Sequence, residues 1–218
     1  MGWTEFATAF VVFFVSHSLP VRPPLRPALQ AALGPRGFTL AYSALSLAVL
    51  AWLIGAAGRA PYVPLWDWAP WQVYVPLLTM LPVCLILALA IARPNPFSFG
   101  GARNGRFDPA RPRIVRLHRH PLLLALALWA AAHAVPNGDL AHVMLFGTFV
   151  AFALLGMRLI DRRQQREIGP KWQELQAATV HAPFWRSVAP VSRLAIGATL
   201  FAGLIWLHRL VIGVSPLP

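Results

Sequence analysis

The chain has 218 residues, of which 57% are hydrophobic and only 12% are charged. Soluble domains carry about 25% charged residues, so this composition excludes an ordinary soluble protein and indicates one that lies in a membrane. The formal net charge of +12 does not indicate a nucleic-acid partner, because the basic residues lie between apolar segments rather than in a separate domain.

Several kinds of site are also excluded by the residue inventory. Cys84 is the single cysteine and lies in an apolar segment, so the sequence has no disulfide framework and no cysteine-based metal site. No residue set resembles a hydrolytic triad. The glycine-rich stretch GGARNG lacks the Lys-Ser/Thr of a phosphate-binding loop.

Six apolar segments are predicted to cross the bilayer, since a transmembrane helix needs about 20 residues. They are 4–20, 38–57, 73–92, 121–136, 140–159 and 192–212. The first is predicted to be a retained span, because its end is too polar and its start too poor in basic residues for a cleavable signal peptide. The fold is therefore predicted to be all-α, a polytopic membrane helical bundle that forms a single integral domain over 1–218.

The fourth of these segments is short and ends at the turn Pro136-Asn137-Gly138. Pro, Asn and Gly favour tight turns, so the fourth and fifth spans are predicted to form a helical hairpin. In the outer loop between the second and third spans, Trp66, Trp68 and Trp71 are expected to belong to an aromatic belt at the membrane boundary.

The positions of the basic residues predict the orientation. Seventeen of the 19 lie in or beside the loops 21–37, 93–120 and 160–191, and only Arg59 and Arg209 are left for the other side. Because cytoplasmic loops carry the excess of Lys and Arg, these loops are predicted to be cytoplasmic and both termini to be periplasmic.

Two cytoplasmic stretches have distinct patterns. DRRQQREIGPKWQELQ is predicted to continue the fifth span and to restart after Gly169-Pro170 as an amphipathic interfacial helix, with Trp172 and Leu175 on one face. RPNPFSFGGARNGRFDPARP, rich in Gly, Pro and Arg, is predicted to be a solvated loop that contacts lipid headgroups.

Of seven histidines, His17 and His133 are singled out because they lie inside predicted spans, where an ionisable side chain is costly and indicates function. His142 only opens the fifth span, and His208 near the end of the sixth is expected to be interfacial. Either His17 or His133 alone is explained equally well by a neutral ring bonded to a carbonyl or hydroxyl. Together, two imidazoles on facing helices can supply both axial ligands of a haem iron, and alanines such as Ala130 and Ala134 would let the macrocycle approach the backbone. His142 is the reserve metal ligand.

The expected depths of the two histidines differ. His133 lies about 18 Å along the helix from Pro121, whereas His17 lies about 8 Å before Arg22, which leaves a mismatch of about 10 Å. The depths would match if the stretch PVRPP dipped into the membrane, or if the charged lead-in RIVRLHRH extended the fourth span into the cytoplasm. Otherwise His142 ligates the iron with His133, or the iron is five-coordinate.

Four stretches together resemble the NnrU family of bacterial inner-membrane proteins over most of the chain. They are HSLPVRPPLRPALQAALGPRGFTLAYSALSLAVLAWL, RAPYVPLW, RHPLLLALALWAAAHAVPNGDLAHVMLFGTFVAFALLGMRLIDRR and GPKWQELQAATVHAPF. The resemblance implies a respiratory context, associated with nitric oxide reductase and denitrification, in the bacterial inner membrane.

That family is similar in turn to the haem b zeta-carotene isomerase, whose two ligating histidines correspond to His17 in HSLP and His133 in WAAAH. At Ala130 the isomerase has a cysteine proposed to exchange as a ligand. The resemblance implies haem b with bis-His iron for redox sensing, electron transfer or redox-gated isomerisation. An apolar small molecule or a redox partner would accompany it.

Two alternatives remain. The motif RHP before an apolar hairpin also resembles the isoprenylcysteine and phospholipid methyltransferases, which implies S-adenosylmethionine held by Arg119, His120, Arg158 and Glu167. The acidic pair of those enzymes corresponds only to Asp161 followed by two arginines. The second alternative is a non-enzymatic accessory protein for respiratory-complex assembly, in which His133→Phe is tolerated and the packing glycines Gly147 and Gly156 are not replaceable.

Overall fold

A computed structural model describes residues 2–99, 102–183, 185 and 190–218. The described elements are helices, with one isolated β-bridge between Pro64 and Asp139, so the predicted all-α class is confirmed. The chain divides into two compact units, residues 1–67 with 138–145 and residues 68–137 with 146–218. The single domain over 1–218 stays a prediction.

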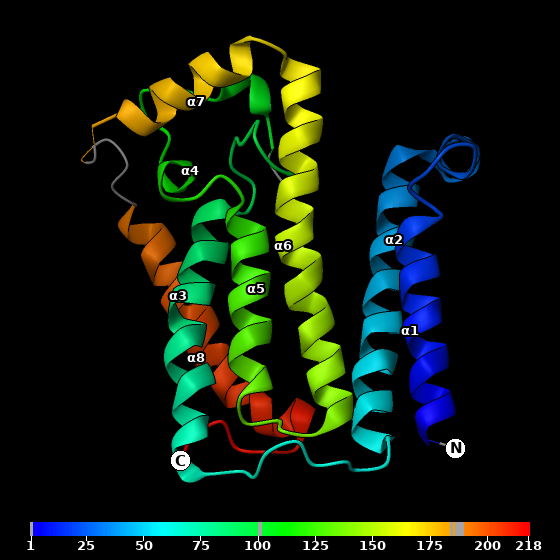
Figure 1. The fold of residues 1–218 in the computed structure, drawn as a ribbon. Helices are drawn as coiled ribbons and strands as arrows, with labels where there is room; N and C mark the ends of the chain where they lie inside the picture. The colour runs from blue at the N-terminus through cyan, green and yellow to red at the C-terminus, as the bar shows by residue number, and fades with distance from the viewer. Residues whose placement is uncertain (1, 100–101, 184, 186–189) are drawn as a thin grey trace. The chain divides into compact units, whose positions relative to one another are not determined.

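The first unit is built on two packed helices, α1 (Gly2–Ser18) and α2 (Leu25–Arg59) (Figure 1). Small and apolar side chains are buried on both, with Ala9 on α1 and Ala56 on α2 fully covered. At one end Arg59 Nη2 donates to Glu5 Oε1 at 2.6 Å, and Trp52 Nε1 donates to the same oxygen at 3.3 Å. This pairing accounts for the one acidic residue of α1.

The helix α2 begins earlier than the sequence indicated, and the prediction of a loop at 21–37 is wrong for residues 25–33. That stretch, LRPALQAAL, is rich in good helix formers. Gly34 then interrupts the helix with φ 70° and ψ 162°, a conformation that glycine adopts without a steric penalty, and Pro35 starts the next helical segment. The predicted span 38–57 lies entirely within this second segment.

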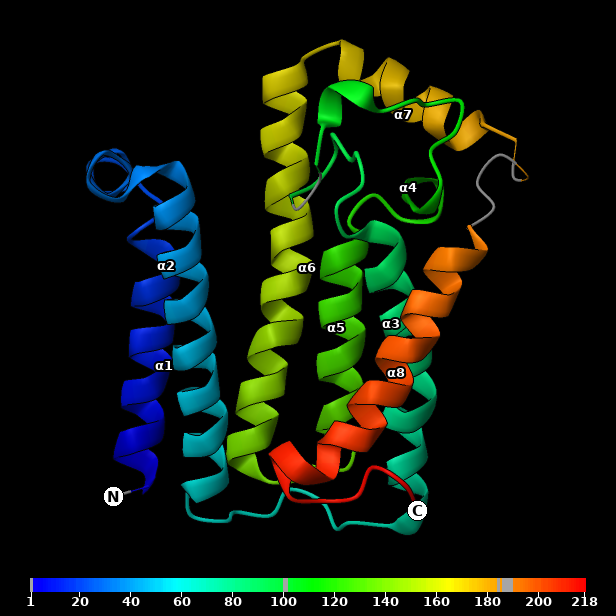
Figure 2. The ribbon, with the colours of Figure 1, turned by 180° about the vertical axis from the view of Figure 1, so that it is seen from behind.

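In the second unit, α3 (Tyr74–Ala90) contacts both α5 (Pro121–Ala134) and α8 (Val191–Ile212). The short 3-10 helix η1 (Pro70–Val73) precedes α3. Figures 1 and 2 show the three helices side by side from opposite directions. The bounds of α3, α5 and α8 agree with the predicted spans to within two residues.

The helix α6 (Leu140–Ile168) runs antiparallel to α5, as the predicted hairpin requires. Trp129, near the end of α5, contacts Phe146 near the start of α6, with ring centroids 5.5 Å apart. Leu123 lies beside Gly156, and Arg119 bonds Asp161. The partners therefore run in opposite order along the two helices, and the hairpin is confirmed.

The turn of the hairpin is held by the preceding loop of the first unit. The backbone N–H groups of Leu65 and Trp66 donate to the Gly138 carbonyl at 2.7 and 3.2 Å, and Leu140 N donates to Val63 O at 2.9 Å. Trp66 packs on this turn and is 39% exposed, whereas Trp68 and Trp71 are 63% and 60% exposed.

Replacement of Gly138 by alanine is expected to destabilise the turn by about 1–3 kcal/mol, the usual cost of overpacking. A Cβ atom there would lie 2.5–2.6 Å from Trp66 Nε1, Cδ1 and O. The measurement is thermal unfolding of the purified protein in detergent. Gly147→Ala is the control, because a Cβ at Gly147 meets nothing within 4 Å and alanine favours a helix. Equal melting temperatures for the two variants would contradict the expectation.

The glycines also correct a prediction of the accessory-protein hypothesis. A Cβ at Gly147 has open space, and one at Gly156 would meet Leu123 at an ordinary 3.5 Å. Among the described residues of the second unit, neither glycine is therefore in a close contact that an added Cβ would disturb. Tight positions among the described glycines include Gly2, Gly138 and Gly197, where the added atom would approach neighbouring backbone.

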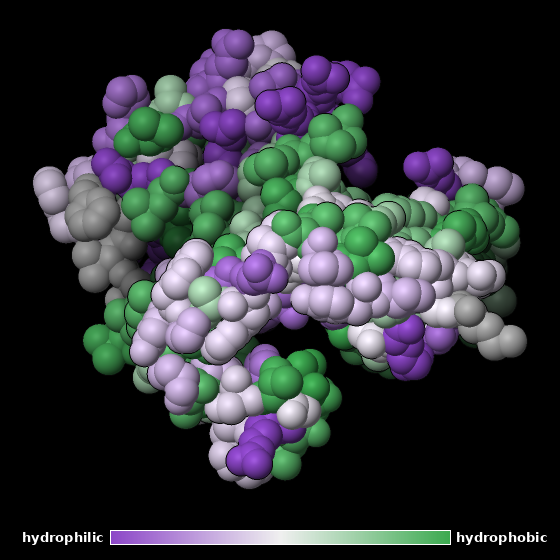
Figure 3. All heavy atoms as spheres, turned by 60° about the horizontal axis from the view of Figure 1, so that its bottom comes forward, coloured by the Kyte–Doolittle hydropathy of each residue, from purple (hydrophilic) through white to green (hydrophobic). Residues whose placement is uncertain are grey.

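Four described helical segments are long and apolar enough to cross a membrane: Leu25–Arg59, Pro70–Ala90, Leu140–Ile168 and Val191–Ile212. The other two predicted spans correspond to α1, with 17 residues, and α5, with 14, which are shorter than the roughly 20 that a span needs. Large apolar side chains such as Leu40 and Leu210 are at least 70% exposed. In the larger unit, hydrophilic residues gather mainly at one end (Figure 3). The protein is therefore a membrane protein.

At that end, α7 (Lys171–His181) follows α6 after Gly169, whose φ of 67° ends the preceding helix as predicted. Trp172 is 7% exposed and packs with Phe97 and Val115, and Leu175 joins the same cluster. The apolar face of α7 is thus occupied by the 93–120 segment. Figure 1 shows α7 crossing above α4 (Ile114–Leu117).

The prediction that 93–112 is a solvated loop is therefore wrong for Asn95, Phe97 and Ser98, which are buried, whereas 103–106 and Arg111 are exposed. Phe97 is fully buried and Asn95 is 5% exposed. The Asn95 side chain accepts from Phe97 N at 3.1 Å and donates to Arg119 O at 2.9 Å. Besides α4, the 93–120 segment forms a short 3-10 helix, η2 (Asn104–Arg106). Its Gly and Pro content indicated turns correctly, but periodicity could not show that the aromatic residues form a core with α7.

Candidate functional site at the start of helix α5

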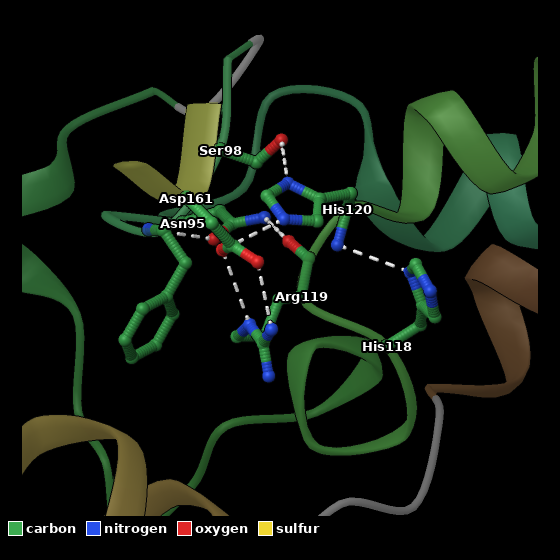
Figure 4. A network of polar contacts seen from close by, with 7 residues as sticks. Asn95, Ser98, His118, Arg119, His120 and Asp161 are labelled. Carbon is green, nitrogen blue, oxygen red and sulfur yellow. Dashed lines mark hydrogen bonds and ion pairs between the residues drawn. The ribbon is translucent and has the colours of Figure 1, made fainter. Parts of the chain in front are cut away.

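A polar network connects the start of α5 to α6 (Figure 4). Asp161 accepts from Arg119 Nη2 at 2.8 Å and lies 3.4 Å from Arg119 Nε. Its Oδ1 is also 3.0 Å from His120 Nε2. Arg119 additionally lies over the Trp172 ring, 5.7 Å from its centroid. One carboxylate therefore holds both residues that open the RHP motif.

The protonation of His120 follows from its surroundings. The residue is 2% exposed, and burial lowers the pKa of its imidazole below the ordinary value, although the charge of Asp161 opposes this effect. The neutral ring donates its Nε2–H to Asp161, so Nδ1 accepts from the Ser98 hydroxyl at 3.0 Å. Both ring nitrogens of His120 are thus bonded inside the protein.

Ser98, His120 and Asp161 follow the order of a hydrolytic triad, which the sequence did not indicate because the residues are far apart in the chain. However, Ser98 is only 4% exposed and does not line the cavity described below. A nucleophile has to reach its substrate. The arrangement therefore acts as a structural link between the 93–120 segment, α5 and α6.

His118 differs from His120 because one of its nitrogens is left for other contacts. Its Nδ1 accepts from the backbone N–H of His120 at 3.1 Å. Burial is the main cause that lowers the pKa of His118 below its ordinary value. In the neutral ring Nε2 must therefore carry the proton, and it serves as a donor.

A cavity of about 250 Å³ adjoins the network. Its lining comes from the 115–120 segment, Phe97 and the α7 residues Gln176, Thr179 and Val180. Arg116, His118, Arg119 and His120 contribute basic groups, and none of the described lining residues is acidic. The helix α7 forms the second wall of this basic cavity.

The set predicted to hold S-adenosylmethionine is only partly brought together. Arg119 and His120 lie side by side, but Glu167 is bonded to Arg163 at 2.7 Å on the exposed side of α6. Six residues, about 9 Å of helix, separate Glu167 from Asp161. The acidic residue in the network is Asp161, and its carboxylate already bonds both Arg119 and His120.

His17 lies near the end of α1 in the first unit. Its Nδ1 is 2.7 Å from the Phe13 carbonyl and 3.3 Å from the Ser16 hydroxyl, and its ring stacks on Phe13 with centroids 4.0 Å apart. The Tyr42 hydroxyl donates to the His17 carbonyl at 3.1 Å. This imidazole has an aromatic environment formed by α1 and α2.

His133 lies near the end of α5 in the second unit and has a similar arrangement. Its Nδ1 is 2.8 Å from the Trp129 carbonyl, and its ring lies 5.5 Å from Trp129 and 5.8 Å from Phe146. Beside it, Ala130 is fully buried and Ala134 is half-buried. The predicted apolar surroundings of His133 are therefore aromatic as well as small.

One expectation about this histidine pair is corrected, namely the extension of the fourth span, while the reserve ligand His142 stays a prediction. The lead-in RIVRLHRH does not extend α5, because Pro121 starts the helix and His118 and His120 adopt non-helical conformations. His142, the reserve ligand, bonds Asp139 through Nδ1 at 2.7 Å, while Asp139 also accepts from His142 N at 3.2 Å and so caps α6. Its ring therefore has a structural role at the start of that helix.

His208, which is predicted to be interfacial, also bonds a backbone carbonyl through its Nδ1 atom. Its Nδ1 is 2.8 Å from the Val214 carbonyl. His133 and His208 are close enough to interact electrostatically. The sequence offered no signal for this proximity, because α5 and α8 are separated by α6 and α7.

The described fold and site define a polytopic helical membrane protein with a polar network at the start of α5. The family model described as NnrU protein matches residues 5–216, so the chain belongs to the NnrU family. No curated protein and no solved structure matches it.

Proposed function

We propose that this NnrU-family protein binds haem b through His17 and His133. It would serve redox sensing, electron transfer or redox-gated isomerisation linked to denitrification and nitric oxide reductase. We place it in the bacterial inner membrane with both termini in the periplasm, which the basic loops support.

The observation that carries the proposal is the tautomer of the two imidazoles. Each Nδ1 is bonded to a backbone carbonyl four residues earlier, at 2.7 Å for His17 and 2.8 Å for His133. A carbonyl can only accept, so each Nδ1 carries a hydrogen, and in a neutral ring Nε2 keeps its lone pair. Histidines that ligate metals are commonly oriented in this way, with the second nitrogen bonded to a carbonyl.

The donor set fits haem better than a bare metal ion. A haem iron needs at most two axial ligands from the protein, and neutral imidazoles supply them in many bundle proteins. Structural zinc needs about four protein ligands. Among the described residues no group of three or more His, Cys, Asp or Glu side chains could hold a metal ion.

The surroundings of each ring suit a flat apolar cofactor. Phe13 lies beside His17, and Trp129 and Phe146 lie beside His133. These side chains would orient the imidazoles and keep water from them. The haem would supply the redox chemistry.

Methyl transfer from S-adenosylmethionine is the alternative, and one observation favours it, namely the cavity beside Arg119 and His120. The observation against this alternative is that the carboxylate nearest the cavity is already bonded. The amino group of that cofactor needs an acidic partner, and Asp161 already bonds Arg119 and His120. The geometry therefore supports haem binding better.

The test is the absorbance spectrum of the full chain, produced in haem-replete cells and purified in detergent, before and after reduction with dithionite. We expect a Soret band that shifts on reduction and is lost in His17→Ala and in His133→Ala. His181→Ala is the matched control, since His181 is exposed on α7 and should leave the band unchanged.

A colourless wild-type protein would overturn the proposal and favour the accessory role. A Soret band that is unchanged in both variants would show that neither His17 nor His133 ligates the iron. Loss of the band in His208→Ala but not in His17→Ala would show that the assignment of His17 is wrong. Thermal melting of each variant separates loss of haem from loss of the fold.

A further inference from the structure

We propose that the cavity between the 115–120 segment and α7 binds the phosphate group of an anionic amphiphile. The cavity lies wholly within the second unit, and the inference does not depend on the haem. The phosphate could belong to a lipid headgroup or be free, and the experiment below distinguishes the two sources.

The first observation that supports the proposal is the charge of the residues that line the cavity. Arg116 and Arg119 place two guanidinium groups on the cavity wall, and none of the described lining residues is acidic. Arginine is suited to phosphate because its planar fork donates several hydrogen bonds at once. The cavity therefore selects an anion.

The second observation is that neutral polar side chains of the lining can donate hydrogen bonds. His118 presents an Nε2–H donor, because its Nδ1 already accepts from His120 N. Gln176 of α7 lines the opposite wall, and the described part of the chain gives its amide no hydrogen-bond partner. Phosphate oxygens accept hydrogen bonds from such donors.

The apolar residues of the lining indicate the rest of the ligand. Phe97 and Val115 form the buried part, while Leu117 and Val180 are 63% and 53% exposed. An exposed apolar edge beside a basic cavity suits a molecule with an anionic head and an apolar tail. A lipid with a phosphate headgroup has this chemistry.

The network behind the cavity explains why its wall is rigid. Asp161 fixes Arg119, and Ser98 and Asp161 fix both nitrogens of His120. Arg116 Nε is held by the Ala182 carbonyl at 2.8 Å. A site whose donors are already positioned loses less entropy on binding.

The experiment is calorimetric titration of the detergent-purified full chain with three probes: inorganic phosphate, dihexanoyl phosphatidic acid and dihexanoyl phosphatidylcholine. We expect phosphatidic acid to bind and phosphatidylcholine not to bind. Binding of inorganic phosphate as well would show that the phosphate alone suffices, whereas its failure would assign the site to a lipid headgroup.

Two variants of α7 test the position. Gln176→Glu places a carboxylate on the cavity wall and should weaken binding by about tenfold or more, through repulsion of the anion. Gln173→Glu makes the same charge change at an exposed position of the same helix outside the lining, and should change the affinity by less than about twofold.

Three results would overturn the proposal. They are the absence of heat with both phosphate probes, equal weakening by the two variants, and binding of S-adenosylmethionine by a protein that ignores phosphate. Arg116→Gln, with Arg111→Gln as the control at an exposed position outside the lining, gives a second test if Gln176→Glu fails to fold.

Discussion

Asp161→Ala is expected to lower the free energy of unfolding by about 3 kcal/mol. Asp161 accepts hydrogen bonds from Arg119 and from His120, at 2.8 and 3.0 Å. His120 is 2% exposed, so its Nε2–H would lose its acceptor without gaining water. Arg119 is 35% exposed at its side chain, and solvent would compensate part of its loss.

The measurement is thermal or denaturant unfolding in detergent, followed by tryptophan fluorescence. Trp172 reports directly, because Arg119 lies over its ring. Glu167→Ala is the matched control, since it removes an exposed ion pair with Arg163 on the same helix and should cost less than about 0.5 kcal/mol. If the two variants were equally stable, the network would contribute no more to the free energy of unfolding than an exposed ion pair does.

The helices could be predicted from the sequence because each depends on a local signal. The apolar lengths gave the spans, and Pro121 marked the start of α5. The turn at Pro136-Asn137-Gly138 gave the hairpin, and Gly169-Pro170 gave the break before α7. The break at Gly34 was missed, because the segment before it is helical in composition yet was assigned to a loop for its arginines.

The site was predicted less well because its contacts join distant parts of the chain. The motif RLHRHP pointed to Arg119 and His120, and Asp161 was noted only as a departure from an acidic pair. No sequence spacing could show that Asp161 bonds both residues, or that Ser98 bonds His120 from a segment rich in Gly and Pro. The roles of His17 and His133 stay predictions supported by their tautomers.

Gly197→Val is expected to destabilise the second unit by about 3 kcal/mol, at the upper end of the usual cost of overpacking. A Cβ at Gly197 would lie 3.0 Å from Leu85 Cα and 3.2 Å from the Cys84 carbonyl oxygen, both in the backbone of α3. Small residues allow membrane helices to approach this closely. A helix backbone cannot move away as a flexible side chain can, so α8 would have to separate from α3.

Separation would also break the contact that ends α3. Arg193, one turn before Gly197 on α8, donates through Nη1 to the Ala88 and Ile91 carbonyls at 2.9 and 3.2 Å. These are carbonyls at the end of α3, where the helix itself offers no donors. Movement of α8 would therefore cost both packing and hydrogen bonds.

Gly203→Val on the same helix provides the control, because a Cβ there meets nothing within 4 Å and valine disfavours a helix less than glycine does. Its melting temperature in detergent should equal or slightly exceed that of the wild type, while that of Gly197→Val should fall by several degrees. A similar fall in both variants would mean that bulk anywhere on α8 is harmful. The close approach to α3 at Gly197 would then not be what holds the two helices together.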